Sequence, residues 1–393
     1  MTDTFSLFAS CQPGLEPFLI EELSRQYVEA EAVPGGATFR GNAQSVMRAC
    51  LWLGTASHIR IRLAQFRCRA LGELERKSAD LPWRDWLVGR VPVHLTARSH
   101  RSRVYHTGGI SERIYNAIGA SFGQSPMIAR DTDDVVAIIT ARFEDDICTI
   151  SLDATSTPLH RRGYRLDGRK APLREDIAHA LVLASGWSPE TAMLDPFCGS
   201  GTIAIEAAGL AMGLPPGRLR APALQQTARF DIESWQEVLG EGTPRNPVAP
   251  IAASDRDKGA IEATRANAKR AGVDTAIKSD VCALAAQKWF EGKAPPAGTV
   301  ITNAPYGVRI QNNKNLAPLY QTLGNRIKAL GEDWNATILA HDMRLARRTG
   351  LPLSPAFSTK HGGLSISAMS TLKNKTTVEK TPTNSTPEGD EQT

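Results

Sequence analysis

Residues 191–206 read TAMLDPFCGSGTIAIE, and this stretch decides the fold. A short apolar run from Ala192 to Leu194 ends at Asp195, a tight glycine turn follows, and Ile203 then opens an alanine-rich helix. Strand, glycine turn and helix in this order bring backbone N–H groups to a helix N-terminus, where a ligand can approach the main chain closely. The stretch therefore predicts an α/β fold with a ligand site at the carboxyl end of a strand.

Three classes of ligand compete for this turn. A phosphate-binding P-loop needs a lysine directly after its last glycine, and no lysine follows Gly201. A dinucleotide site needs a third glycine, where this chain has Ala204, and an acid about 20 residues on at a strand end. The third class is S-adenosylmethionine, with the turn against its methionine and ribose portions and Asp195 facing its amino group. We favour the third.

Two later acids support that interpretation. The run VAPIAASD ends at Asp255 and precedes a helix expected from Lys258 to Ala271, and the run TAIKSD ends at Asp280. The Asp255 carboxylate can accept hydrogen bonds from both ribose hydroxyls, and the Asp280 carboxylate can accept one from the adenine amino group. A single Asp at a strand end is more often a helix cap or a turn residue. Three successive strands that each end in Asp favour a binding site.

A fourth apolar run, GTVITN at 298–303, ends at Asn303 and is followed by Ala304, Pro305 and Tyr306. The side-chain oxygen of Asn303 and the carbonyl of Ala304 are adjacent acceptors, able to hold both hydrogens of a planar NH₂ group. Tyr306 could stack on the base that carries the amine. The alternative is an ordinary turn, since Asn, Pro and Gly punctuate many chains.

These segments resemble a known family. DPFCGSGTIAIEAA, ASDRDKGAIEATRANAKRAGV and ITNAPYGVRI are similar to the successive motifs of class I methyltransferases. LHRRGYRLDGRKAPLREDIAHALV, residues 159–182, resembles the entry segment of the THUMP-domain RNA methyltransferases, which modify the exocyclic amine of guanine in ribosomal RNA or tRNA. The resemblance spans roughly residues 5–370 and is more specific in the C-terminal half.

The resemblance implies a Rossmann-like class I methyltransferase domain with a mostly parallel seven-stranded sheet, preceded by an α+β ferredoxin-like and THUMP RNA-binding module. It implies S-adenosylmethionine as the methyl donor and methylation of a guanine N2 amine, with large-subunit ribosomal RNA favoured. Methylation of guanine N2 in tRNA and methylation of adenine N6 stay open as alternatives. So does a different class of protein, an RNA-binding ribosome-assembly factor with a vestigial methyltransferase fold.

The motifs of the resemblance predict the residues of the site. The expected catalytic residues are Asn303, Ala304, Pro305 and Tyr306. The expected donor-binding residues are Asp195, Pro196, Phe197, Gly199, Ser200, Gly201, Thr202, Asp255, Arg256, Asp280 and Val281. One departure stands out, because the family tetrad is similar to Asn-Pro-Pro-Tyr and this chain has Ala304 at the first proline. The backbone carbonyl survives that change, and Pro305 still biases Ala304 toward an extended conformation.

Basic residues gather in three runs before the methyltransferase motifs, at 58–69, 98–106 and 160–174. Three such runs suit a long polyanion better than a small substrate. The expected RNA contacts are Arg60, Arg62, Arg101, Arg103, Arg161, Arg162, Arg165, Arg169 and Lys170. The alternative for each run is a solvated face or a set of local salt bridges. Tyr105 and Tyr164 could stack on bases, or could equally be core residues.

The composition of the chain limits which classes of protein it can belong to. The chain has 393 residues, a formal net charge of +5 and six cysteines without close pairs. We expect no disulfide framework, no metal, no secretory signal and no membrane span, and hence a cytoplasmic protein, expected to be monomeric. The predicted divisions are an N-terminal α+β module at 1–60, a THUMP-like domain at 61–155, a basic linker at 156–175, the methyltransferase domain at 176–372 and a disordered tail at 373–393. An insertion at 213–247 is expected to be a surface segment, or alternatively a lid or an RNA contact formed by Arg218, Arg220 and Trp235.

Overall fold

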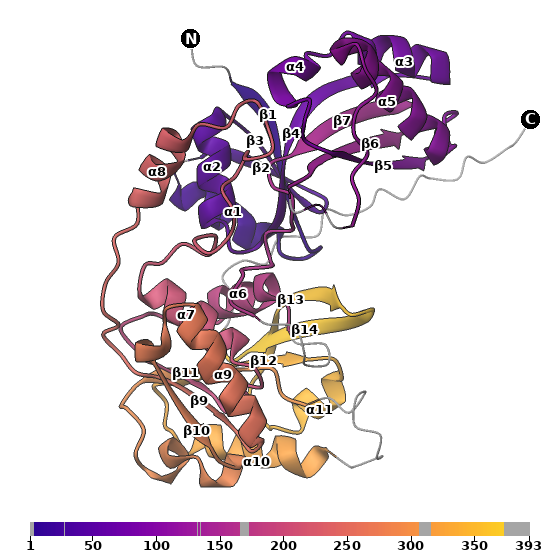
Figure 1. Ribbon diagram of the computed structural model, residues 1–393. Coiled ribbons are helices and arrows are strands. Elements are labelled where there is room, and N and C mark those ends of the chain that lie inside the picture. Colours follow the sequence, from indigo (N-terminus) through magenta and orange to yellow (C-terminus); the bar gives the residue numbers. More distant parts are fainter. Residues whose placement is uncertain are drawn as a thin grey trace, which may run out of the picture.

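The computed structural model describes residues 4–26, 28–131, 133, 135–165, 173–305 and 316–372. Within them the chain forms two α/β bodies, each built on a seven-stranded sheet (Figure 1). Tyr306, Arg169, Lys170 and the tail at 373–393 lie outside the described residues. No helix in the described part of the chain is long and apolar enough to cross a membrane.

The N-terminal body is one mixed sheet in the order β2-β3-β1-β4-β7-β6-β5. All neighbouring strands are antiparallel except β5 and β6, which are parallel. Its strands are β1 (Phe5–Cys11), β2 (Ala30–Val33), β3 (Gly36–Gly41), β4 (Ala56–Arg67), β5 (Val93–His100), β6 (Ala137–Glu144) and β7 (Ile147–Asp153). Its helices are α1 (Glu16–Arg25), α2 (Ala43–Trp52), α3 (Leu71–Ala79), α4 (Trp83–Trp86) and α5 (Thr107–Phe122).

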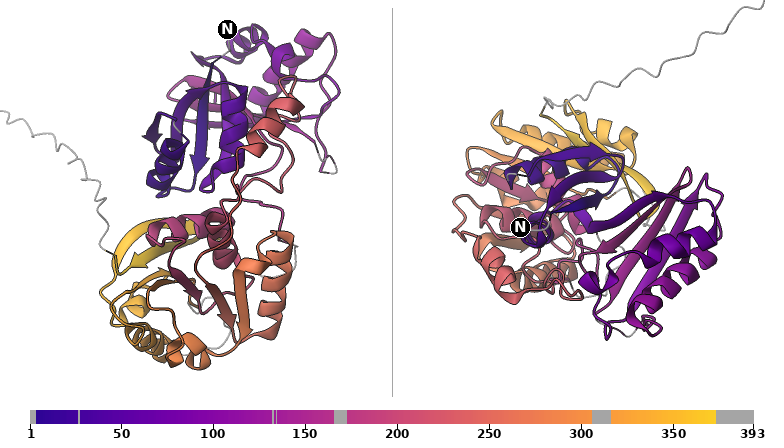
Figure 2. Two further views of the ribbon diagram at one scale, coloured as in Figure 1. Left: turned by 90° about the vertical axis from the view of Figure 1, so that its left-hand side faces the viewer. Right: turned by 90° about the horizontal axis from the view of Figure 1, so that it is seen from above.

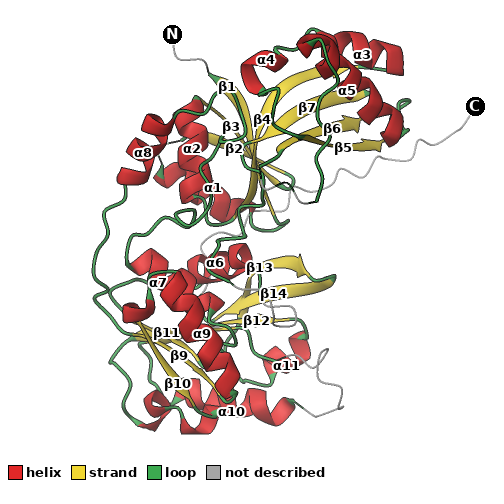
Figure 3. Cartoon of the chain, viewed as in Figure 1, coloured by secondary structure: helices red, strands yellow, loops and turns green. Residues whose placement is uncertain are grey.

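Strand β4 belongs to both predicted N-terminal units. It pairs with β1 on one side and β7 on the other, so residue 60 lies inside a strand. Helices α3 and α5 pack on each other over the half of the sheet toward β5 (Figure 3). Helix α4 lies nearer β1, where the ring centres of Trp86 and Phe5 are 4.8 Å apart. Ile59 and Ile61 are buried while Arg60 and Arg62 are half-buried on the other face, as an alternating strand requires. A division of this body into two domains stays a prediction.

The C-terminal body carries the methyltransferase motifs on a sheet in the order β10-β9-β8-β11-β12-β14-β13. The five strands from β10 to β12 are parallel, and β14 is antiparallel to both of its neighbours. The strands are β8 (Ala192–Asp195), β9 (Ile251–Asp255), β10 (Ile277–Val281), β11 (Gly298–Thr302), β12 (Trp334–Ala340), β13 (Ser354–His361) and β14 (Leu364–Ser370). The helices are α6 (Glu175–Ala184), α7 (Thr202–Ala211), α8 (Ile232–Gly240), α9 (Lys258–Arg270), α10 (Ala317–Lys328) and α11 (Met343–Arg347).

The predicted α/β fold class is confirmed, and its central strands explain why. Every residue of β8 and β11 is buried, because helices cover both faces of a parallel sheet. Chain order reverses between these two strands, since β9 and β10 follow β8 on one side while β11 and β12 lie on the other. Open α/β sheets bind ligands at such a switch point, beyond the carboxyl ends of the strands.

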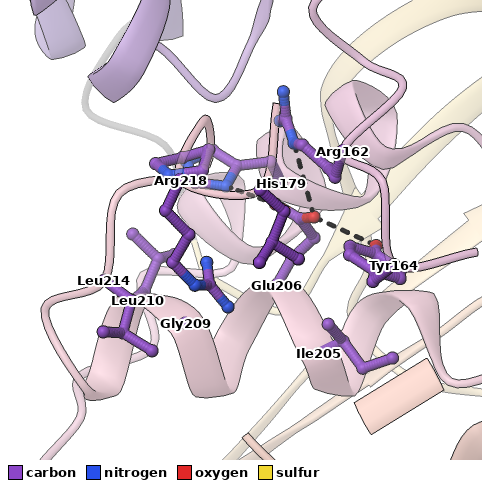
Figure 4. A pocket seen from close by; sticks show the side chains of 11 residues that line it. Arg162, Tyr164, His179, Ile205, Glu206, Gly209, Leu210, Leu214 and Arg218 are labelled. Carbon is purple, nitrogen blue, oxygen red and sulfur yellow. Dashed lines mark hydrogen bonds and ion pairs between the residues drawn. The ribbon is translucent and has the colours of Figure 1, made fainter. Parts of the chain in front are cut away.

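A buried charge network joins the two bodies. It consists of Glu22 on α1, His179 on α6, Glu206 on α7 and Arg162 on the segment that enters the C-terminal body. His179 lies between two carboxylates, with Nε2 at 3.1 Å from Glu22 and Nδ1 at 2.9 Å from Glu206. Arg162 Nε lies 3.6 Å from Glu206, and Tyr164 donates its hydroxyl hydrogen to the same carboxylate at 3.1 Å (Figure 4).

Each charge in this network has further partners, which is what allows it to be buried. Glu22 accepts the backbone N–H groups of Gly54 at 2.7 Å and Thr55 at 3.0 Å. Arg162 donates to the carbonyls of Gly54 and Leu159. The His179 ring also lies against Gly54, where an added Cβ would come within 2.3 Å of Nε2. Only glycine fits at that position.

The insertion at 213–247 is a second link between the bodies. Its helix α8 packs against α2 of the N-terminal body (Figure 2). Arg220 donates to the carbonyl of Cys50 on α2, and Arg48 of α2 forms an ion pair with Glu241. Trp235 is buried, so the insertion is a packed strap rather than a free surface loop.

We predict that Glu22→Gln lowers the free energy of unfolding by about 3 kcal/mol, because breaking a buried ion pair leaves an uncompensated charge. Glu21→Gln is the matched control. Its exposed pair with Arg25 is worth roughly 0.5 kcal/mol. Urea titration of both variants measures the difference. Equal unfolding midpoints would show that the network does not hold the bodies together.

The same network predicts a pH dependence. Burial acts to lower the pKa of His179, but its hydrogen bonds with Glu206 and Glu22 outweigh burial and raise the pKa to about 9. The stabilisation from His179 is therefore complete below its ordinary pKa of 6.5 and is lost as pH rises through about 9. Stability measured from pH 6 to pH 10 should fall across that window in the wild type and stay flatter in His179→Gln.

Candidate active site

The glycine turn between β8 and α7 is the first wall of the site. Gly199 and Gly201 have φ of +54° and +84°, in the left-handed region that favours glycine. A Cβ at Gly201 would lie 2.7 Å from the side chain of Thr264, whereas a Cβ at Gly199 would meet no atom within 4 Å. The turn thus packs against the protein at Gly201 and faces open space at Gly199.

Helix α9 holds this turn in place through two residues that the motif analysis missed. Thr264 Oγ1 donates to the carbonyl of Gly199 at 3.0 Å, and Asn267 Nδ2 donates to that of Ser200 at 2.9 Å. Both side chains are buried, at 0% and 4% exposure. Their signal was present in the sequence, since two polar residues three apart on the buried face of an amphipathic helix need polar partners.

Asp195 at the tip of β8 is buried, and only one of its oxygens is bonded. Oδ1 accepts from Thr302 Oγ1 at 2.6 Å and from the N–H of Phe197 at 3.1 Å. Oδ2 is buried and bonds to no described residue. Burial, with a smaller contribution from the charge of Asp255, raises the pKa of Asp195 to about 7. Such a carboxyl favours a cationic partner.

Asp255 at the tip of β9 connects the second strand to the turn. Its Oδ2 accepts the N–H of Gly199 at 3.1 Å, and its Oδ1 accepts that of Asp257 at 2.9 Å. Asp280 and Val281 are exposed at the end of the adjacent β10, where Val281 lies opposite Asp255 in the parallel register. The three acids therefore end neighbouring strands at one edge of the sheet, as predicted.

The remaining predicted donor-binding residues surround the turn. Pro196 and Thr202 are buried, and Phe197 and Ser200 are half-buried. Arg256 is exposed at the start of the loop that leads into α9. All eleven predicted donor-binding residues thus lie on the turn or at the tips of β8, β9 and β10; their contacts with a donor stay a proposal.

The tip of β11 is the opposite wall. Asn303 Oδ1 is buried and bonds to no described residue, and Ala304 is 1% exposed. The carbonyl of Pro305 accepts the Tyr320 hydroxyl at 3.2 Å, which anchors the loop from α10. Tyr306 lies outside the described residues. Asp195 Oδ2 and Asn303 Oδ1 are thus two buried acceptors at the switch point that have no partner among the described residues.

These walls fit a cationic donor and an amine substrate. The unbonded Asp195 oxygen suits an ammonium group, the open face of Gly199 leaves room for an extended ligand, and the unbonded oxygen of Asn303 suits an N–H donor. Buried polar atoms normally have partners, and these two acceptors at one strand edge suit ligand groups that donate hydrogen bonds.

Two of the predicted RNA contacts are wrong. Arg162 is 1% exposed and belongs to the buried charge network. Arg165 is mostly buried and donates to Thr202 Oγ1 at 2.8 Å and to the Leu173 carbonyl at 2.9 Å. Glu206, the acidic partner of Arg162, and Thr202, the hydroxyl partner of Arg165, lie on α7, far along the sequence. Arg165 also forms an ion pair with Glu175 at 3.4 Å. The basic run alone therefore resembled an exposed surface. Tyr164 is likewise buried and not a base-stacking residue.

The other described basic residues stay candidates. Arg161 and Arg103 are exposed. Arg101 is exposed and within 3.5 Å of Glu144 and Asp145. Arg60 lies 3.9 Å from Asp153, and the Arg62 guanidinium stacks 5.3 Å from the ring centre of Phe8. Arg62 is the better candidate of that pair, because no acid is recorded within ion-pair distance of it among the described residues.

Comparison with known proteins assigns the family. Residues 162–366, just over half of the chain, match the model of the RMKL-like methyltransferase domain. The chain belongs to this methyltransferase family. Residues 6–60 match the model of the RlmL ferredoxin-like domain, so the ferredoxin-like module predicted from the sequence is confirmed.

A relative and two solved structures agree with this assignment. The ribosomal RNA large subunit methyltransferase K/L of Syntrophotalea carbinolica is 30% identical over 384 residues, which are 93% of this chain and 53% of the relative. The chain thus spans about half the length of the curated relatives that it matches. SMU.472, a methyltransferase complexed with SAH, has a TM-score of 0.83 at 26% identity and covers 94% of this chain and 98% of its own. A protein from Listeria monocytogenes described as an N6-adenine-specific DNA methylase has a TM-score of 0.82 at 26% identity, covering 93% and 96%.

The raised pKa of Asp195 generates a prediction. If its carboxylate holds the ammonium group of S-adenosylmethionine, affinity for the donor should fall by about tenfold for each pH unit below about 7, because the carboxyl is then protonated. An Asp with an ordinary pKa would hold the ligand down to about pH 4. Calorimetry between pH 5 and pH 8 measures this slope. Asp195→Asn should bind weakly at every pH, and an equal slope in that variant would remove Asp195 from the donor site.

Proposed function

We propose that this protein transfers a methyl group from S-adenosylmethionine to the exocyclic N2 amine of a guanine in RNA, with large-subunit ribosomal RNA as the substrate. The observation that carries the proposal is the buried, unbonded Oδ1 of Asn303 at the switch point. It lies next to the backbone carbonyl of Ala304 and on the strand adjacent to the glycine turn.

The chemistry explains why two acceptors are needed. The lone pair of an amine on a purine is delocalised into the ring, so the nitrogen is planar and weakly nucleophilic. Asn303 Oδ1 and the Ala304 carbonyl would accept one hydrogen each and favour a tetrahedral nitrogen. As positive charge develops on that nitrogen, both acceptors stabilise it in a site from which water is excluded. Holding the amine in place supplies the remaining advantage.

The donor would lie between the glycine turn and the strand tips. Asp195 would hold its ammonium group, Asp255 its ribose hydroxyls, and Asp280 with Val281 its adenine. When bound, the donor supplies an electrophilic methyl group on a sulfonium sulfur. The buried charge network serves this site indirectly, because Glu206 lies one turn after Thr202 on the helix that continues the glycine turn.

Two observations favour RNA as the substrate. The N-terminal body carries exposed arginines at 98–103 and the arginine face of β4, which suit phosphate groups. The relatives named ribosomal RNA large subunit methyltransferase K/L match both bodies of this chain. A monomeric state and a cytoplasmic location stay predictions.

We predict that Asn303→Ala lowers turnover on RNA by at least about 100-fold, as removal of one charge-stabilising group does in other enzymes. Affinity for S-adenosylmethionine should stay within about twofold, since Asn303 is not on the donor side. Asn335→Ala is the matched control, because this half-buried Asn is the second residue of β12 and lies at the opposite edge of the sheet. Turnover within a few-fold of the wild type would show that Asn303 does not hold the amine.

Ala304→Pro tests the departure from the family tetrad. The change keeps the carbonyl, and the Ala304 N–H forms no backbone hydrogen bond recorded among the described residues. Turnover should therefore be equal to or above that of the wild type. A loss of more than about tenfold would indicate that the carbonyl is not used as proposed.

Nucleoside analysis of the methylated RNA separates the alternatives. N2-methylguanine in large-subunit ribosomal RNA supports the proposal. N2-methylguanine in tRNA, or N6-methyladenine, would show that the protein acts on a different substrate from the one proposed. RNA binding without turnover by the wild type would instead support an assembly factor.

A further inference from the structure

Four exposed cations follow β12 or lie near the β13–β14 turn of the C-terminal body, and neither wall of the site uses them. They are Arg344, Arg347 and Arg348, on and just after α11, and Lys360 near the end of β13; we call them the basic rim. All four side chains are exposed. Residues 334–372 contain a single acid, Asp342, which lies 3.4 Å from Arg344. No described acid lies within ion-pair distance of the other three.

Sheet topology places this rim at the edge where the amine pocket opens. β11 and β12 are parallel and adjacent, with Thr302 opposite Ile338, so Asn303 and the residues after β12 leave the same edge. Leu345 of α11 packs on the same apolar cluster as Ala304. The turn between β13 and β14 reaches this edge as well, because β14 runs antiparallel to β12 and His341 Nδ1 lies 2.7 Å from the Ser365 carbonyl.

The arginines of α11 lie together on the exposed side of the helix. Asp342 caps the helix by accepting the N–H of Arg344 at 2.8 Å, and Ala346 is buried. Residues three and four apart share a helix face, so Arg344, Arg347 and Arg348 lie side by side. Like charges at this spacing destabilise a short helix. Arg344 has Asp342 as a partner, whereas Arg347 and Arg348 have no acid within ion-pair distance among the described residues. The grouping therefore suits an external polyanion.

We propose that the basic rim binds phosphate groups of the RNA next to the target nucleotide, on the β12–β14 side of the pocket. This inference rests on the proposed function. A base can enter the pocket only if its own backbone passes over the sheet edge, and the rim is the cationic surface that continues from the Asn303 side. Its contacts go to phosphates, so they position the strand without reading its sequence. The N-terminal body would hold a more distant part of the same RNA.

The test compares two double variants of equal charge. Arg347→Gln/Arg348→Gln removes half of the rim, and glutamine keeps a high helix propensity. Lys269→Gln/Lys293→Gln is the control, because these exposed lysines lie at the end of α9 and in the loop before β11, at the opposite edge of the sheet. The probe is large-subunit ribosomal RNA from cells that lack the protein, with filter binding, turnover and donor calorimetry measured at several salt concentrations.

The rim variant should bind RNA about tenfold more weakly than the control at 150 mM salt. Its log affinity should depend on log salt with a slope smaller by about 1.4, as expected for two lost phosphate contacts to a single strand. Its turnover at saturating RNA and its affinity for the donor should stay within about twofold of the control.

Equal RNA affinity and equal salt slope in the two variants would overturn the proposal; that result is also expected if the rim binds an acidic polypeptide instead. Failure of the proposed function is a separate outcome, seen as absence of methyl transfer by the wild type. In that case the filter-binding comparison still decides whether the rim contacts RNA.

Discussion

The imidazolium of His179, held between Glu22 and Glu206, is the interaction on which the arrangement of this molecule depends. Glu22 comes from the N-terminal body and Glu206 from the helix that follows the glycine turn, so one buried side chain links the N-terminal body to the helix of the proposed donor site. Burial of this charge is tolerated because every carboxylate around it accepts further hydrogen bonds. Arg162 adds a second cation on Glu206, and its charge together with the His179 bond outweighs burial and lowers the pKa of Glu206 to about 2.

The site itself follows from the order of the strands. β8 and β11 are neighbours at the switch point, and Thr302 Oγ1 bonds Asp195 across them at 2.6 Å. This bond adds to the backbone pairing of the two strands, and the second oxygen of Asp195 bonds to no described residue. The glycine turn is fixed from the other side by Thr264 and Asn267, so both walls are held before any ligand binds. Such preorganisation is what positioning and electrostatic catalysis require.

The sequence alone predicted which residues lie at the strand tips, but it did not predict which arginines are buried where the two bodies join. Asp195, Asp255 and Asn303 each end an apolar run, and the carboxyl ends of parallel strands meet at one edge, so local pattern carried the information. Arg162 and Arg165 lie in a basic run, and their partners Glu206 and Thr202 on α7 are distant in sequence. No periodicity marks which arginine of such a run is buried. Burial there depends on the packing of one body against another, which only tertiary structure supplies.

Ala304 shows how the fold can replace what a proline supplies. A first proline in the tetrad would restrict the backbone of the loop through its fixed φ. Here Ala304 is enclosed in an apolar cluster with Tyr320, and the hydroxyl of that tyrosine holds the carbonyl of Pro305 at 3.2 Å. The loop is thus restrained by packing on one side and by a hydrogen bond on the next residue. The acceptor that we propose at residue 304 is a backbone carbonyl, so its direction depends on these restraints and not on the side chain at 304.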